Sequence, residues 1–306
     1  MSQNLKSSSI HNLNADRGLG FIDKFKYIFL NWLNNLSPYE DLDQHISIEP
    51  FKNDLWRKEI VNTYKESSVG RRLSDLFWRT LPWEKIEGEL GRVHVFDTGC
   101  GHGNYGARLM DASGGRLTSY TGIDAKERDN WQVLKEKFPN FNFIKTKSDD
   151  ISSYIPKDTN LFITQSAIEH FDEDLLFFER IRDFIKETQK PVIQIHLFPA
   201  AATLPLYLFH GLRQYTPRTV SKIARLFDDK SNIHLFGLGG EKGKRLHFKY
   251  FTWPLLILRQ KATWSKNVGR YDKEVREVIE YDINHPSKSP IFWALIIHSN
   301  PKKEIW

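Results

Sequence analysis

From residue 90 onward, short apolar runs alternate with longer stretches in which apolar residues recur at helical spacing. The apolar runs are typical of buried strands, and the stretches between them are long enough for helices that connect parallel strands. The predicted strands are 93–96, 117–123, 142–146, 161–164 and 192–197, and the predicted helices are 104–112, 127–138 and 173–187. This order predicts an α/β fold, with a doubly wound, mostly parallel sheet covered by helices on both faces.

The C-terminal part continues the pattern with one long connection. A predicted helix at 217–227 begins with Pro217, which suits a first helical turn, and Thr216 suits its N-terminal cap. Strands at 232–236 and 291–298 bring the predicted sheet to seven strands. We interpret the long link between these last two strands as an insertion on the substrate side.

The pattern also divides the chain. Residues 1–20 are polar and rich in Ser and Asn, which predicts a disordered tail. Residues 21–89 are predicted to form N-terminal helices, and 90–306 to form the main domain. Within that domain, we expect segments of about 198–216 and 237–290 to face the substrate.

Two apolar segments differ from ordinary core elements. Residues 21–36 place bulky apolar side chains on one helical face, and 248–258 is an aromatic and aliphatic run flanked by Lys and Arg. Such a pairing is expected where a protein contacts an anionic membrane surface. We therefore predict that these two segments contact a membrane surface peripherally, with packing against the core as the alternative.

Composition narrows the class of protein only slightly. The 306 residues are 40% hydrophobic and 27% charged, as in ordinary globular proteins, and no apolar run is long enough to span a membrane. The net charge of +6 is compatible with anionic partners. The single cysteine, Cys100, excludes an intramolecular disulfide, and the N-terminus resembles no secretory signal. We expect a cytoplasmic protein, at the inner face of the membrane if the two apolar segments contact it.

The most informative motif is the sequence Asp97-x-Gly99-x-Gly101-x-Gly103, between the first predicted strand and its helix. Glycines allow a sharp turn and let a ligand approach the backbone closely. The helix that follows favours polar or anionic groups at its N-terminus. The next predicted strand ends in Gly122-Ile123-Asp124. These features predict a cofactor-binding turn.

This succession resembles the class I S-adenosylmethionine (SAM)-dependent methyltransferases, mainly over residues 90–200. The resemblance implies that the glycine turn packs against the methionine and ribose of SAM, and that Asp124 binds the ribose hydroxyls. It also implies an acidic contact to the adenine, from Asp149 or Asp150, although adjacent aspartates can simply cap a helix. Asn104 and Gln165 complete the implied cofactor-binding set. In this family the last strand is inserted antiparallel, normally after a shorter link than the one found here.

The segment Glu169-His170-Phe171 resembles small-molecule and ubiquinone-type O-methyltransferases, in which it can lie beside the acceptor. His170 has an ordinary pKa near 6.5, so it can take a proton from a hydroxyl at neutral pH. Glu169 could orient it or help to hold a divalent metal, but we assign no metal ligands. His196 is a further catalytic candidate, and His210 is expected on the same side. The alternative is that Glu169 and His170 only cap the next helix.

The acceptor is constrained mainly by exclusion. Residues 165–168 lack the motif of base amino-methyltransferases, Cys100 is misplaced for cytosine C5 methylation, and no RNA-binding module is evident. We therefore expect an acceptor other than a nucleic acid, and 2′-O-methylation of RNA stays open as an alternative. Aromatic residues within 198–253 favour a glycan, a lipid-linked sugar or another small molecule, methylated on a hydroxyl, as in polysaccharide clusters. The alternatives are an NAD(P)-binding oxidoreductase of the Rossmann type and a catalytically inert protein of the same fold.

Overall fold

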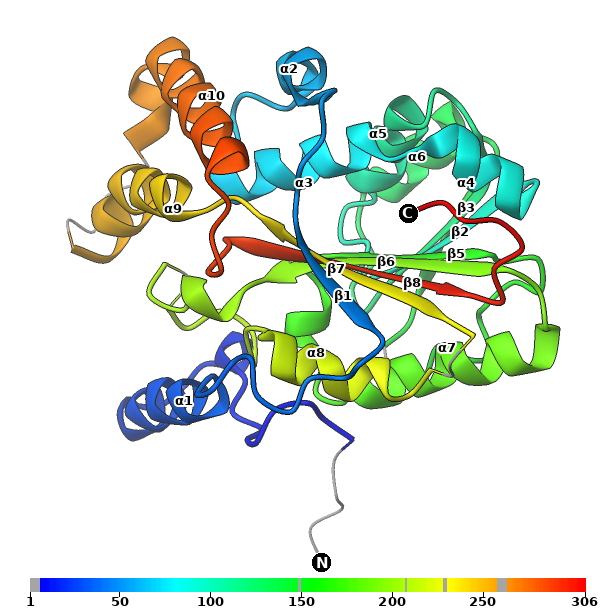
Figure 1. Cartoon of the computed structure of the whole chain (residues 1–306), viewed down its shortest axis with the longest axis horizontal. Helices are drawn as coiled ribbons and strands as arrows, with labels where there is room; N and C mark the ends of the chain where they lie inside the picture. Colours follow the sequence, from blue (N-terminus) through cyan, green and yellow to red (C-terminus); the bar gives the residue numbers. More distant parts are fainter. Residues whose placement is uncertain (1–5, 148–149, 207, 228–229, 258–262) are drawn as a thin grey trace, which may run out of the picture.

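The computed structural model describes the whole chain except residues 1–5, 148–149, 207, 228–229 and 258–262. Its centre is a single sheet in which eight strands are found among the described residues (Figure 1). The strands are β1 (Ile46–Pro50), β2 (Val93–Thr98), β3 (Leu117–Asp124), β4 (Phe141–Lys145), β5 (Leu161–Gln165), β6 (Val192–Pro199), β7 (Asn232–Leu238) and β8 (Phe292–Ser299). Their order across the sheet is β1-β7-β8-β6-β5-β2-β3-β4.

The sheet confirms the predicted doubly wound α/β class. All its neighbouring strands pair in parallel except β8, which lies antiparallel between β6 and β7. That placement is the one expected from the resemblance, despite the long connection before β8. The apolar pattern predicted seven strands, and the eighth strand found in the structure is β1, which pairs with β7 at the edge. β1 is short, only partly buried and ends in Pro50, so its pattern is weak and suits an edge strand.

Helices cover both faces of the sheet. In Figure 1, α3 (Val69–Thr80), α4 (Trp83–Leu90), α5 (Asn104–Ala112) and α6 (Asn130–Lys137) lie on one side, and α7 (Asp174–Thr188) and α8 (Pro217–Ala224) lie on the other. The apolar core accordingly forms two clusters, one on each face. Strands buried on both faces explain the continuous apolar runs in the sequence. The predicted start of α8 is confirmed, because Thr216 caps it through a reciprocal hydrogen-bond pair with Thr219.

The long link between β7 and β8 is folded. It contains α9 (Glu241–His247), a π-helix η5 (Phe248–Ile257), a short 3-10 helix η6 (Thr263–Lys266) and α10 (Val268–Asn284). The predicted apolar segment 248–258 is thus described up to residue 257. The N-terminal region supplies α1 (Phe21–Asn34) and α2 (Trp56–Glu59). No helix in the described part of the chain is long and apolar enough to cross a membrane.

Residues 6–20 lie against the main domain, which differs from the disordered tail expected from their composition. The backbone amide and the hydroxyl of Ser8 both donate to the buried carboxylate of Asp174. Arg213, also buried, donates to the hydroxyl of Ser7. Polar residues hold this segment through specific hydrogen bonds to partners far away in sequence, and composition gives no signal for such contacts.

Candidate functional site

The glycine turn lies at the carboxyl end of β2, near the middle of the sheet. Gly99, Gly101 and Gly103 all have positive φ angles, of 79°, 54° and 75°. A Cβ on Gly99 would lie 2.5 Å from the Cβ of Ala167, and one on Gly103 would lie 2.5 Å from Phe143. A Cβ on Gly101 would meet no atom within 4 Å. Packing therefore requires the first and third glycines, whereas the second borders open space.

Two aspartates flank this turn. Asp97 is buried at the end of β2 and accepts a hydrogen bond from the Tyr120 hydroxyl through Oδ2. Its Oδ1 has no hydrogen-bond partner among the described residues. Burial raises the pKa of Asp97 to about 7. Asp124 ends β3 and accepts from the backbone amides of Gly101, at 3.0 Å, and Lys126, at 2.9 Å. Asp124 thus holds the glycine turn from the neighbouring strand.

A cavity of about 650 Å³ opens beside the turn. Gly99 and Asp124 line it from the sheet, Ser166 and His170 line it from the loop after β5, and Asp16 lines it from the N-terminal segment. The carboxyl ends of neighbouring parallel strands are where open α/β sheets bind ligands. Ser166 has a φ of 50°, which is uncommon for a residue other than glycine and is concentrated at functional sites.

The remaining cofactor candidates are placed less directly. Asn104 begins α5, is exposed, and accepts a hydrogen bond from Asn130. The buried side chain of Gln165 accepts from the indole of Trp78 at 2.8 Å, so it connects α3 to the sheet. Asp150 is exposed and does not line the cavity, and Asp149 lies outside the described residues. Adenine contact by either aspartate stays a prediction.

The structure brings Glu169 and His170 together with His210, which is 40 residues away in sequence. His170 hydrogen-bonds through Nδ1 to the carboxylate of Asp16, at 2.5 Å. Its Nε2 lies 3.9 Å from Oε1 of Glu169, and Nε2 of His210 lies at the same distance from that oxygen. Both carboxylate oxygens of the fully buried Glu169 lack a hydrogen-bond partner among the described residues. Neither Glu169 nor His170 caps α7, whose first turn has no side-chain cap.

The charges in this cluster are coupled. Burial lowers the pKa of His170, but the hydrogen bond to Asp16 and the charges of Glu169 and Asp16 raise it, and the net shift is upward. The same hydrogen bond lowers the pKa of Asp16. Burial raises the pKa of Glu169 to about 7. An imidazole oriented by a carboxylate in this way is the usual arrangement of a general base.

The cluster could also hold a metal ion. One ligand atom from each of Glu169, His170 and His210 lies within 4.8 Å of the other two. Two imidazoles and one carboxylate form a common ligand set for Zn²⁺ and Fe²⁺. At such sites the second nitrogen of a ligating histidine commonly hydrogen-bonds to a carboxylate, as His170 does to Asp16.

His196 is not part of this arrangement. It is fully buried on β6, where its Nδ1 shares a hydrogen bond with the Thr164 hydroxyl, and its ring packs edge-on against Phe177 and Phe178. Burial lowers its pKa to about 3, so it stays neutral at physiological pH. This placement is that of a core histidine, and we do not carry it into the catalytic set.

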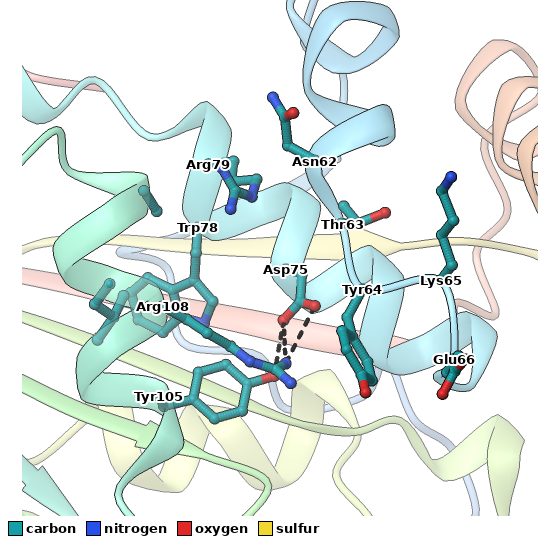
Figure 2. A pocket seen from close by; sticks show the side chains of 12 residues that line it. Asn62, Thr63, Tyr64, Lys65, Glu66, Asp75, Trp78, Arg79, Tyr105 and Arg108 are labelled. Atoms are coloured by element: carbon teal, nitrogen blue, oxygen red, sulfur yellow. Dashed lines mark hydrogen bonds and ion pairs between the residues drawn. The ribbon is translucent and has the colours of Figure 1, made fainter. Parts of the chain in front are cut away.

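One residue of the site and one separate cavity were missed from the sequence. Asp16 lies in the segment that was expected to be disordered, and no motif marks it. A second cavity, of about 470 Å³, lies between the loop 62–66, α3 and α5 (Figure 2). There, Tyr105 and Arg108 both point at the carboxylate of Asp75, and Tyr64 lies beside them. It shares no lining residue with the cavity beside the glycine turn. We place the candidate site at the cavity beside the glycine turn, because the turn and His170 both line that cavity.

Comparison with known proteins gives no assignment. No family model matches the chain, and no curated protein matches it. Among solved structures, a putative sarcosine dimethylglycine methyltransferase from Galdieria sulphuraria is 14% identical, with a TM-score of 0.47 over 76% of this chain and 85% of that one. The plantazolicin methyltransferase BamL is also 14% identical, with a TM-score of 0.45 over 80% and 90%. The [4+2]-cyclase SpnF is 10% identical, with a TM-score of 0.45 over 83% and 98%. Likeness at this level supports no particular activity for this chain.

Proposed function

We propose that this chain is a SAM-dependent methyltransferase that methylates a hydroxyl of a glycan, a lipid-linked sugar or another small molecule. The observation that carries the proposal is one cavity bordered by both the glycine turn and the base candidate His170. A methyltransferase needs a donor site and an acceptor proton to be within reach of each other, because most of its catalysis is positioning.

The residues at the turn fit SAM. Gly101 leaves space for a ligand against the backbone, and Asp124 would hold ribose hydroxyls. The buried Asp97 has one oxygen without a partner among the described residues, which suits a cationic ligand group. SAM carries an ammonium and a sulfonium group, whereas a dinucleotide would bring an anionic pyrophosphate toward this aspartate. A cationic group near Asp97 would keep this carboxylate ionised, whereas a pyrophosphate would oppose its ionisation, and this difference favours SAM over NAD(P).

The catalytic chemistry can be divided between the cofactor and the chain. When bound, SAM supplies an electrophilic methyl group. A hydroxyl acceptor must lose its proton as the oxygen takes the methyl, and His170 would receive that proton at Nε2. Asp16 would hold the ring through Nδ1 and stabilise the imidazolium. A neutral amine can attack before it loses a proton, so a positioned base favours a hydroxyl acceptor.

The proposal of a glycan acceptor depends on the aromatic residues of the 198–253 region, and these residues differ in their exposure to solvent. Phe198 and Tyr215 are fully buried and belong to the core. Phe248 and Trp253 are more than 40% exposed. Only the exposed rings are available to an acceptor.

Methyl transfer from radiolabelled SAM to a cell extract, fractionated into lipid, glycan, protein and RNA, tests the proposal. We expect label in the glycan, lipid or small-molecule fraction, and its loss with His170→Ala. Label in RNA or protein would contradict the acceptor class. Absence of label from every fraction, despite confirmed SAM binding, would instead support an inert protein of this fold.

A further inference from the structure

The outer face of α1 is apolar and exposed. Five large apolar side chains of the helix, together with Leu36 just after it, are between 41% and 78% exposed: Phe21, Ile22, Phe25, Phe29, Trp32 and Leu36. We call this set the α1 stripe. At 1.5 Å per residue, the 14-residue helix presents the stripe along about 21 Å. Soluble helices normally bury such a face.

The opposite face of α1 attaches the helix to the protein, and it does so through polar groups. Tyr27, Asn31 and Asn34 are the buried residues of the helix. The Tyr27 hydroxyl donates to the carbonyl of His210, at 2.9 Å, and Asn34 accepts from the amide of Ile10. The helix is therefore held with its apolar side outward, next to the histidine cluster.

A second exposed apolar group lies at the same end of the molecule. Phe248, Trp253 and Leu255 of η5 are between 42% and 51% exposed. The loop after β6 links η5 to α1, because Thr252 donates to the carbonyl of Leu206 and the Lys24 ammonium lies 5.7 Å from the ring centre of Phe209. Figure 1 shows α1 and α9, which leads into η5, at one end of the sheet.

The charges beside these apolar groups are mainly positive. Lys24 and Lys26 are exposed and, at 100° per residue, border the α1 stripe on opposite sides. Asp23, which lies 3.8 Å from Lys26, is the single acidic residue of α1. Residues 241–249 add four basic side chains and one acidic one. Two copies of α1 packed together would bring these lysines near one another, whereas anionic headgroups would neutralise them.

We infer that the α1 stripe and η5 form a docking surface for an anionic lipid membrane. The helix would lie in the plane of the interface, with its aromatic side chains among the headgroups and acyl chains and its lysines at the phosphates. The candidate site would then face the lipid surface, where a lipid-linked acceptor would be held. Membrane binding does not require the proposed methyl transfer, so either can fail without the other.

Co-sedimentation of the full chain with vesicles tests this inference. The probes are vesicles of phosphatidylcholine alone and of phosphatidylcholine with phosphatidylglycerol, at low and high salt. We expect binding to the anionic vesicles at low salt, and at least a tenfold loss of binding in the double variant Phe25→Ser/Phe29→Ser. Val133→Ser, which alters an equally exposed apolar residue on α6, is the matched control and should bind like the wild type.

Two further measurements keep the test decisive. If the double variant does not fold, judged by its melting temperature, Lys24→Gln/Lys26→Gln replaces it and should weaken binding about fivefold for each charge removed. Sedimentation velocity without lipid reports self-association. Absence of binding to anionic vesicles, or an equal loss with Val133→Ser, overturns the inference. A dimer that Phe25→Ser/Phe29→Ser dissociates, without any vesicle binding, would assign the surface to a second copy instead.

Discussion

Replacing the glycines of the turn one at a time should separate folding from cofactor binding. In Gly99→Ala, the new Cβ must occupy space 2.5 Å from the Cβ of Ala167, and the residue must keep a φ of 79°. The left-handed backbone costs about 1–2 kcal/mol for a residue other than glycine. Overpacking adds about 1–3 kcal/mol. We therefore expect a loss of about 2–5 kcal/mol in the free energy of unfolding.

Gly101→Ala should behave differently. Its φ of 54° carries the same backbone cost of about 1–2 kcal/mol, but no atom lies within 4 Å of the new Cβ. Gly101 borders open space next to the cavity, and in the proposed complex SAM would extend along this backbone, where the methyl group would obstruct it. We expect near-normal folding and at least about a tenfold weaker SAM affinity, because close backbone approach is what the glycine permits.

Chemical denaturation and titration calorimetry with SAM measure the two effects separately. Gly115→Ala is a suitable control, because this glycine also has a positive φ, of 81°, and open space around it, but lies just before β3, at the opposite end of the sheet from the turn. It should lose about 1–2 kcal/mol of stability and keep full SAM affinity. Equal stability losses in Gly99→Ala and Gly101→Ala, or unchanged SAM affinity in Gly101→Ala, would show that the two glycines do not have these separate roles.

Three other variants test the residues around the turn. Asp124→Ala should weaken SAM binding by about 1–3 kcal/mol in calorimetry, the cost of losing hydrogen bonds to a charged group, and unchanged affinity would remove it from the site. His170→Ala should lower turnover about 10²-fold or more with little change in SAM affinity, whereas equal losses of both would point to a structural role. Because the pKa of His170 is raised, turnover should begin to fall on the acid side at a pH above 6.5. Asp16→Asn removes a carboxylate that raises this pKa, so the acid limb of the pH profile should move to lower pH. A limb that does not move would disconnect Asp16 from the base.

Stability offers an independent check on the ordered N-terminal segment. Asp174 and Arg213 form an ion pair at 3.3 Å and both are fully buried. Asp174→Ala leaves the guanidinium buried without this partner and removes the acceptor for Ser8. We expect a loss of about 3–5 kcal/mol in chemical denaturation. Faster proteolysis within residues 6–20 should accompany it, and an unchanged cleavage rate would show that Ser8 does not hold the segment.

The sequence predicted the central sheet well, because strands buried on both faces leave continuous apolar runs and the helices between them keep a clear period. The start of α8 at Pro217 was likewise predictable from local capping chemistry. β1 was not, because a half-exposed edge strand has little pattern. The turn from Gly99 to Gly103 was recognisable because its backbone needs positive φ angles, and glycine is the residue that adopts them readily.

The histidine cluster was only partly predictable. Glu169 and His170 adjoin in sequence, but their meeting with His210 and Asp16 depends on tertiary contacts between distant loops. For His196, the position near the end of a predicted strand suggested a catalytic role. The structure shows that its ring packs in the core, which the sequence does not reveal. For α1, the apolar period was visible in the sequence, but the face that is buried could not be predicted, because polar hydrogen bonds determine it.

Calorimetric titration of the full chain with SAM and, separately, with NADH distinguishes the proposed methyltransferase from a dinucleotide-binding protein. We expect saturable one-to-one binding of SAM that Asp124→Ala and Gly101→Ala weaken, and no binding of NADH under the same conditions. Tight binding of NADH without binding of SAM would contradict the proposed function and identify the glycine turn as a dinucleotide site.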